Sequence, residues 1–171
     1  MRNQSVVSMS RDELEQLYSG CAQQLFTCAL VITCSPVQAE DAVHEAFCRL
    51  LRRRVAPADL KAYVFRVVRN AAIDQIRRRA SSLDSLPDAI FDASPPPSEL
   101  AEEREFKQQI VELLQSMSAD ERETIVQHLY GELTFQEIAT VRQRPLGTVT
   151  SWYRRGIEKL HREMEVTDGF V

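Results

Sequence analysis

The segment from Leu133 to Leu160 constrains the fold most strongly, because its periodicity fits two helices separated by a tight turn. Thr134 and Glu137 have the spacing of a capping box, which predicts the start of the first helix. Pro145 suits the first turn of the second helix. One face of that second helix is apolar: Leu146, Val149, Tyr153, Ile157, Leu160 and Met164. This pattern predicts a helix-turn-helix, whose second helix enters the major groove of DNA.

The opposite face of the second helix is polar and basic, as a DNA-reading surface requires. Long arginines can make bidentate contacts to guanine, and short hydroxyl side chains can approach base edges or a thymine methyl. The residues expected to make these contacts are Thr150, Ser151, Arg154 and Arg155. Phosphate contacts are expected at the turn and the helix start, from Arg142, Arg144 and Thr148.

Two other residues of the second helix are expected to serve packing. Trp152 lies at the edge of the apolar face, and we expect it to pack against the preceding helix rather than contact DNA. Gly156 lowers helix stability, so it predicts a close approach of a neighbouring helix.

The rest of the chain also follows helical periodicity. Capping pairs at Ser10 and Ser118 predict helices that end near Cys34 and at Gly131, while Ser35 caps a helix that begins with Pro36. Further helices are expected from about residue 60 to residue 79 and from residue 98. No segment alternates as a strand does. The expected fold is therefore all-α, as two small helical bundles.

An acidic, proline-containing linker is expected between the bundles. Residues 80–97, ASSLDSLPDAIFDASPPP, lack periodicity and end in three prolines. We therefore predict a first domain at 1–80, a linker at 81–104 and a second domain at 105–171. Several apolar residues in the linker leave open that part of it docks on a partner.

Charge is segregated along the chain, although the net charge is only −4. Residues 49–79 hold ten basic and two acidic residues, residues 80–132 hold twelve acidic and three basic, and residues 142–162 hold six basic and one acidic. Two basic segments around an acidic one indicate two DNA-contacting surfaces. Solvated helix faces are the alternative explanation. On the helix expected from about residue 60 to residue 79, basic residues lie beside Asn70. Such residues suit phosphate contacts, and the amide suits hydrogen bonding to a base.

Other functions find little support. The four cysteines form no C-x-x-C pair, and His44 and Cys48 have no second pair of ligands at matching spacing, so no metal or cofactor is expected. His128 and His161 lack a nucleophile at a recognisable spacing, so we expect no enzyme. Without a signal peptide or a long apolar run, membrane insertion is not expected and a cytoplasmic protein is.

Three segments in order carry a resemblance to a known family. They are AEDAVHEAFCRLLRR (39–53), LKAYVFRVVRNAAIDQIRRR (60–79) and SADERETIVQHLYGELTFQEIATVRQRPLGTVTSWYRRGIEKL (118–160). Together they resemble a bacterial RNA polymerase sigma factor of the extracytoplasmic-function type, which has only two structured regions. The resemblance covers about 14–79 and 105–162.

The resemblance implies an initiation factor whose first domain is sigma region 2-like and whose second is sigma region 4-like. The implied partners are core RNA polymerase, through its clamp helices and flap, promoter DNA and an anti-sigma factor. Polymerase binding is implied for Asp41, Glu45, Phe47 and Leu50. Recognition of an unpaired −10 element, with a base flipped into a pocket, is implied for Arg53, Arg54, Lys61, Arg66, Arg69, Asn70, Arg77 and Arg78. The helix-turn-helix is implied to read the −35 element as duplex.

This chain departs from the family pattern at several positions. Thr150 stands where the family usually has Lys or Arg, Trp152 where it has Arg, and Tyr63 where it has Trp. The loop from Val55 to Asp59 is short and lacks the usual Phe-Arg-Gly-like run. The −35 contacts are therefore expected to differ from those of the family. A stand-alone helix-turn-helix regulator that binds operator DNA remains the alternative function.

Overall fold

The computed structural model describes residues 7–8, 10–52, 55–57, 59–81, 114 and 116–168. The first bundle contains α1 (Arg11–Thr33), α2 (Pro36–Leu51) and α3 (Leu60–Ser81), and the second contains α5 (Ala119–Leu129), α6 (Phe135–Arg142) and α7 (Leu146–Asp168). The predicted linker, most of the helix predicted from residue 98, and the candidate site residues Arg53 and Arg54 lie outside the described residues.

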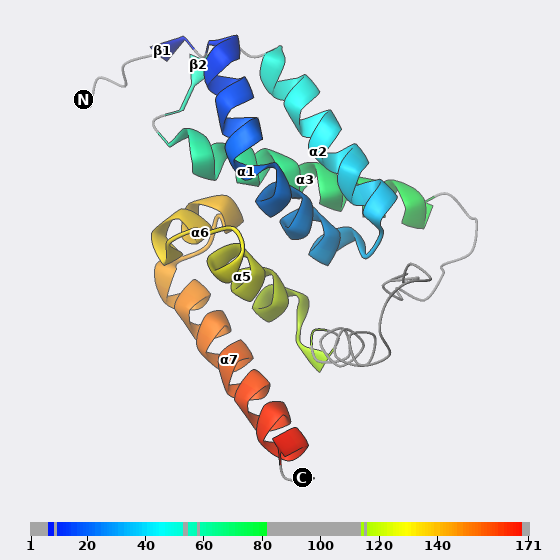
Figure 1. The fold of residues 1–171 in the computed structure, drawn as a ribbon, viewed down its shortest axis with the longest axis vertical. Helices are drawn as coiled ribbons and strands as arrows, with labels where there is room; N and C mark the ends of the chain where they lie inside the picture. Colours follow the sequence, from blue (N-terminus) through cyan, green and yellow to red (C-terminus); the bar gives the residue numbers. More distant parts are fainter. Residues whose placement is uncertain are drawn as a thin grey trace.

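The expected all-α fold with two bundles is confirmed (Figure 1). The described residues add one small feature, a pair of two-residue antiparallel strands, β1 (Val7–Ser8) and β2 (Val55–Ala56). Segments this short carry no visible alternation in the sequence. The pair ties the chain before α1 to the loop between α2 and α3.

Local side-chain hydrogen bonds set the helix starts, as the sequence predicts. Capping boxes are complete at Ser10, Ser118 and Thr134, each with a glutamate three residues later. Ser35 caps α2, with Pro36 in its first turn. These caps pair backbone N–H groups that would otherwise lack partners within the helix.

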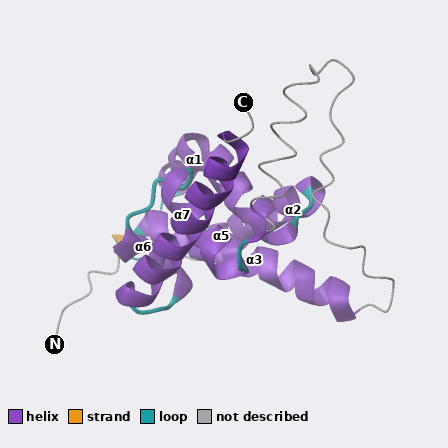
Figure 2. Cartoon of the chain, turned by 90° about the horizontal axis from the view of Figure 1, so that it is seen from below, coloured by secondary structure: helices purple, strands orange, loops and turns teal. Residues whose placement is uncertain are grey.

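The first bundle is built on α3, which packs against both α1 and α2 (Figures 1 and 2). Its core includes Leu25, Leu50 and Val64, each at most 1% exposed. Helix α1 is kinked at Cys21, whose φ of −137° is not helical. The kink follows Gly20, and the Cys21 thiol donates a hydrogen bond to the Leu17 carbonyl at 2.9 Å.

The second bundle contains the predicted helix-turn-helix in α6 and α7. The turn depends on Gln143, which adopts a left-handed backbone conformation (φ 52°) and whose N–H bonds back to the end of α6. Gly156 allows α5 and α7 to meet closely, because a Cβ there would lie 2.4 Å from Cδ1 of Ile125. The prediction of close packing at Gly156 is confirmed. Leu146, expected in the core, is instead 44% exposed.

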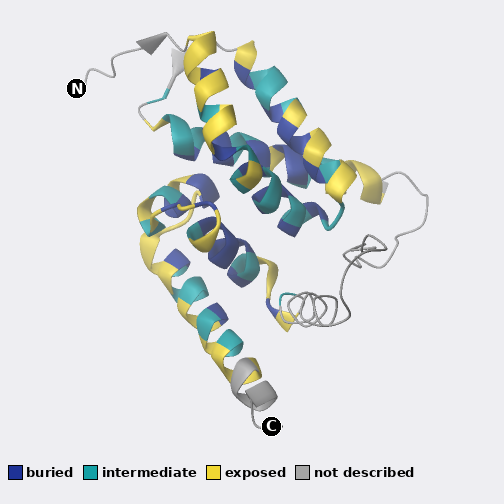
Figure 3. Ribbon diagram, in the orientation of Figure 1, coloured by how far each residue is buried: buried dark blue, intermediate teal, exposed yellow. Residues whose placement is uncertain are grey.

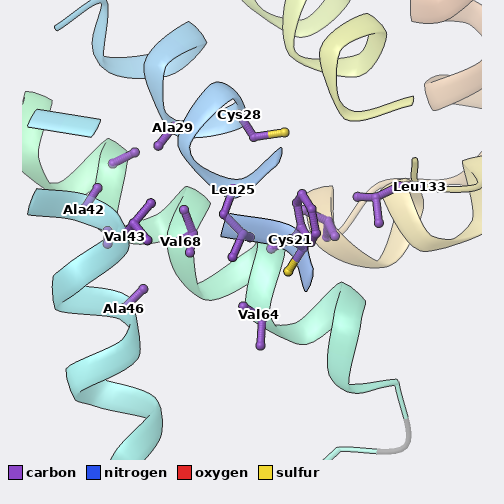
Figure 4. Close-up of a cluster of buried hydrophobic side chains, with 14 of the residues drawn as sticks. Cys21, Leu25, Cys28, Ala29, Ala42, Val43, Ala46, Val64, Val68 and Leu133 are labelled. Atoms are coloured by element: carbon purple, nitrogen blue, oxygen red, sulfur yellow. The ribbon is translucent and has the colours of Figure 1, made fainter. Parts of the chain in front are cut away.

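The two bundles contact one another directly. Helix α5 packs on α1, and α6 packs on α3 (Figures 1 and 2). Their buried side chains form one cluster, which includes Leu133 of the second bundle together with Cys21 and Val64 of the first (Figure 4). Helix α7 extends away from this contact, and many residues along it remain exposed (Figure 3). Helical periodicity does not predict this contact between the bundles.

Candidate nucleic-acid interface

The basic face of α3 is partly covered by the second bundle. Arg69 forms an ion pair with Glu123 of α5, with Nε 2.7 Å from Oε2. Lys61 donates from Nζ to the Glu132 carbonyl at 3.0 Å. The Arg69 side chain is only 18% exposed. Two predicted −10 contacts therefore bond to protein in this structure.

The other described candidates on α3 lie nearer the solvent. Asn70, Arg77 and Arg78 are exposed, and the half-buried Arg66 places its guanidinium 5.1 Å from the centre of the Tyr63 ring. Arg78 pairs with Glu45 of α2 at 3.1 Å. A surface ion pair of this kind is weak enough for a phosphate to replace it. These four side chains form a candidate set on α3, with Arg78 on the side nearer α2.

The prediction that Arg142 contacts a phosphate is wrong, because its side chain is buried in the core. Its side chain is 3% exposed; it is ion-paired with Asp120 and, at 3.1 Å, with Glu123. Its guanidinium also lies 5.0 Å from the centre of the Trp152 ring. Burial lowers the pKa of Arg142, but two carboxylates keep the charge compensated. The sequence placed it at a turn, and only the tertiary contact with α5 buries it.

The exposed face of α7 carries the predicted base-reading residues together. Arg154 is 74% exposed and only loosely paired with Glu158, at 3.8 Å. Arg155 is 52% exposed and lies 3.2 Å from Glu121 of α5. The Thr150 and Ser151 hydroxyls both donate to the Gly147 carbonyl, at 3.1 and 2.8 Å. Their oxygen lone pairs are thereby left to accept hydrogen bonds from outside.

The start of α7 offers a second kind of contact. Arg144 is exposed in the turn and Thr148 is half-buried one turn into the helix. Both lie beside a helix N-terminus, where backbone N–H groups favour phosphate. Trp152 is half-buried against the core, as predicted. Its ring therefore packs behind the exposed face of α7 that carries Thr150 and Arg154.

Sequence reasoning missed the part played by the first turns of α5. Glu121 is 6% exposed at its side chain and binds both Lys159 (2.7 Å) and Arg155 of α7. Burial raises the pKa of Glu121, but hydrogen bonds from Lys159 and from Ser118 outweigh it and leave the pKa below its ordinary value. The signal in the sequence was an acidic run at a capped helix start, which we interpreted only as bulk acidity.

The predicted polymerase-binding residues lie on α2, but not all of them are accessible. Asp41 is exposed, Glu45 is half-buried and Phe47 lines a groove of about 640 Å³ between α1 and α2. The prediction for Leu50 is wrong as a direct contact, since it is 1% exposed and belongs to the core. The lip of the groove instead carries Leu51, which is 55% exposed. Helical periodicity would place Leu51 next to Leu50 in the apolar stripe of α2, but its side chain faces the groove.

The described residues contain no group of three or more His, Cys, Asp or Glu side chains arranged to hold a metal ion. None of the helices in the described part of the chain is long and apolar enough to cross a membrane.

Comparisons with known proteins agree with this arrangement. Residues 17–82 match the family described as sigma-70 region 2, and residues 107–160 match sigma-70, region 4. The comparison with curated proteins gives no match. Among solved structures, the chain resembles the sigma factor RpoE from Bartonella quintana, solved with the anti-sigma factor NepR. The sequences are 20% identical, the TM-score is 0.72, and the match covers 91% of this chain and 98% of the other.

A second solved relative is CnrH, in complex with the cytosolic domain of CnrY. Its sequence is 17% identical, with a TM-score of 0.63 and coverage of 95% of this chain and 92% of that one. At these identities the two structures establish a shared fold. The two sigma-70 matches together span more than half of the chain, in the order that the bundles follow. The chain therefore belongs to the sigma-70 family of RNA polymerase sigma factors, and it is a member of the extracytoplasmic-function type.

Proposed function

We propose that this chain is an alternative sigma factor, which binds core RNA polymerase in the cytoplasm and directs it to a specific set of promoters. The observation that carries the proposal is the presence of both sigma-70 regions in order, each with a basic helical face. In this view the first bundle serves the −10 element and the second serves the −35 element. The chain acts by binding, not by catalysis.

The second bundle reads the −35 element as duplex DNA. Arg154 is the leading base-reading residue, because it is exposed and only weakly paired. The Thr150 and Ser151 oxygens present lone pairs, which suit the exocyclic amino groups of adenine or cytosine. Arg144 and Thr148 hold phosphates at the start of α7. Arg155 becomes a further base-reading residue once its ion pair with Glu121 is broken.

The first bundle holds the −10 element through α3. Arg66, Asn70 and Arg77 are accessible now, and Tyr63 beside Arg66 offers an aromatic ring on which an unpaired base can stack. Arg69 and Lys61 become available only after the bundles separate. Arg53 and Arg54 remain predicted members of this set.

The groove between α1 and α2 is the proposed face for polymerase. It is lined largely by apolar side chains, with Tyr18 packed edge-on against Phe47 at a centroid distance of 4.8 Å. Asp41 and Glu45 supply acidic groups beside it. RpoE and CnrH were each solved with a partner, an anti-sigma factor and the cytosolic domain of CnrY. We propose that a protein of the anti-sigma type also controls this chain.

A mobility-shift experiment separates this function from that of a stand-alone regulator. Duplex promoter fragments from the source genome are incubated with the chain alone, with core polymerase alone, and with both. A sigma factor gives a heparin-resistant shift only when both proteins are present. Tight, sequence-specific binding by the chain alone, unchanged by polymerase, would instead identify an operator-binding regulator and refute the proposal.

A further inference from the structure

A strand from the start of the chain pairs with the loop between α2 and α3 (Figure 1). Val7 of β1 lies opposite Ala56 of β2. Ser8 lies opposite Val55 in the same antiparallel register. Pro57 follows β2 directly, and a proline restricts the residue before it to an extended conformation while donating no hydrogen bond itself. The sequence of the loop therefore both favours β2 and ends it.

The paired strands are attached to fixed points on the first bundle. Strand β1 lies just before α1, whose start is closed by the capping box of Ser10 and Glu13. After β2, the Asp59 carboxylate accepts a hydrogen bond from the Ala62 N–H at 2.9 Å, at the start of α3. Residues 55–59, which we call the α2–α3 loop, are therefore held at both ends.

The α2–α3 loop carries few side-chain groups that could read a base. Its first four residues are Val, Ala, Pro and Ala, which have no polar side-chain atom, and the Asp59 carboxylate already binds the start of α3. In the sequence the loop nevertheless stands between Arg54 and Lys61, two members of the proposed −10 set. Hydrogen bonds from residues 55–58 to an unpaired base can therefore come only from the main chain.

Pairing with β1 arranges these main-chain groups. In an antiparallel pair, one residue directs both its N–H and its C=O toward the partner strand, and the next directs both away. One of Val55 and Ala56 therefore presents a donor and an acceptor on the edge of β2 away from β1, which no other strand among the described residues occupies. The order of donor and acceptor on the Watson–Crick edge separates adenine and cytosine from guanine and thymine.

We propose that β1 is a positioning element for −10 recognition, which holds β2 so that its free edge hydrogen-bonds to an unpaired base. The inference rests on the proposed function, because it assigns the α2–α3 loop to the −10 element. Without β1 the loop is ordered only when DNA binds, and that ordering costs conformational entropy. Since β1 acts through its main chain, the identity of its two side chains is unimportant.

Disulfide cross-linking tests the pairing in the full chain. Ser8→Cys/Val55→Cys places thiols at positions that are directly opposite in the register. Val7→Cys/Val55→Cys is the matched control, one residue out of register. In oxidised glutathione the first pair should close at least about tenfold faster than the second, as quantified by mass spectrometry of the linked peptides. Equal rates would show that β1 has no fixed register on β2, and would overturn the proposal.

A promoter selection tests the role of β1 in recognition. Core polymerase with the chain transcribes a DNA library that is randomised across the −10 and −35 regions of one mapped start site, and the transcribed templates are sequenced. Val7→Pro/Ser8→Pro removes both N–H donors of β1, whereas Val7→Ala/Ser8→Ala keeps them. The proline variant should lose about tenfold of the preference for favoured over disfavoured bases at −10 and keep its preference at −35. The alanine variant should match the wild type.

Two further chains make the result decisive. Deletion of residues 2–8 should reproduce the proline variant, with its helices verified by circular dichroism and its polymerase affinity by pull-down. Oxidised Ser8→Cys/Val55→Cys should keep the wild-type preference at −10, and loss of that preference would show that the loop must leave β1 to bind DNA.

The −35 preference separates failure of this inference from failure of the proposed function. An unchanged −10 preference in the proline and deletion variants would overturn the inference alone. So would an equal loss at −10 and −35, because that reports a general loss of structure. If even the wild type shows no base preference in either region, the proposed function fails and the inference fails with it.

Discussion

Three carboxylates at the start of α5 pair with cations from three other helices. Asp120 and Glu123, three residues apart on one face of the helix, both pair with the buried Arg142 of α6, and Glu123 also pairs with Arg69 of α3. Glu121, on another face, pairs with Lys159 and Arg155 of α7. At the residue scale, α5 therefore fixes the helix-turn-helix and joins it to the first bundle.

Glu121 should make the second bundle sensitive to acid. Its pKa lies below the ordinary value when the chain is folded, so its stabilising effect is complete above the unfolded pKa of about 4.3 and is lost as the pH falls through the folded pKa. Urea denaturation should show Glu121→Gln to be less stable by about 1–3 kcal/mol at neutral pH. The difference between the two stabilities should shrink as the pH falls below the unfolded pKa and should disappear once the pH is below the lower, folded pKa of Glu121. A constant difference at all pH values would contradict this role.

Gly156 and Ile125 should be energetically coupled. A Cβ at residue 156 would meet Cδ1 of Ile125, the atom that valine lacks. Gly156→Ala should cost about 1 kcal/mol of unfolding free energy, after the gain in helix propensity. In an Ile125→Val background the same change should cost nothing or stabilise. The two effects are measured by chemical denaturation in a double-mutant cycle. Equal effects in the two backgrounds would show that other parts of the bundle shift to relieve the clash, so that Ile125 is not coupled to residue 156.

At the scale of the element, α2 and α7 each present one functional face and bury the other. Val149 of α7 is fully buried while Thr150 and Arg154 face solvent, and on α2 Leu50 is buried while Leu51 is exposed. The burial of each helix fixes the direction in which its exposed side chains point. This alternation separates the residues that bind partners from those that hold the fold.

Arg154→Ala should weaken promoter recognition without affecting folding. The arginine is largely exposed and its ion pair is long, so stability should change by less than about 0.5 kcal/mol. Affinity of the polymerase complex for cognate promoter duplex should fall by about 1–3 kcal/mol. Arg162→Ala, an exposed arginine two turns further along α7, is the control and should have a much smaller effect. Loss of core binding in Arg154→Ala would refute the division of roles between the bundles.

Leu51→Asp should disrupt polymerase binding through the groove between α1 and α2. Leu51 is exposed, so the charge should change stability by about 0.5 kcal/mol or less while spoiling an apolar contact. Pull-down with core polymerase should show at least a tenfold loss of affinity, roughly 1.4 kcal/mol. Val37→Asp places the same charge on an exposed apolar position of α2 outside the groove and should bind normally. Equal losses of polymerase affinity in both variants would show that polymerase does not bind at the groove.

Features that depend on near neighbours in sequence could be predicted, and features that depend on the contact between bundles could not. The caps at Ser10, Ser118 and Thr134 are local hydrogen bonds, so spacing was enough to find them. Arg142 looked like a turn residue because the acids that bury it come from α5. Ala62 and Phe65 of α3 are buried because three other helices pack around α3, and a single apolar stripe along the sequence does not indicate such wide coverage.

At the scale of the whole molecule, the chain has two DNA-binding bundles that now contact one another. The contact covers part of α3 but leaves Arg154 on α7 and the groove beside α2 accessible. The proposed polymerase groove and the proposed −35 face are therefore both open, whereas Arg69 and Lys61 of the proposed −10 face are held by the second bundle.

Mapping of transcription start sites tests the central claim most directly. Purified core polymerase is given fragments of the source genome, with and without the chain, and the 5′ ends of the transcripts are sequenced. The account predicts a small set of defined start sites that appear only with the chain and that share sequence near −10 and −35. These sites should be lost with Arg154→Ala and with Leu51→Asp but kept with Val37→Asp. Identical start sites with and without the chain would contradict the account.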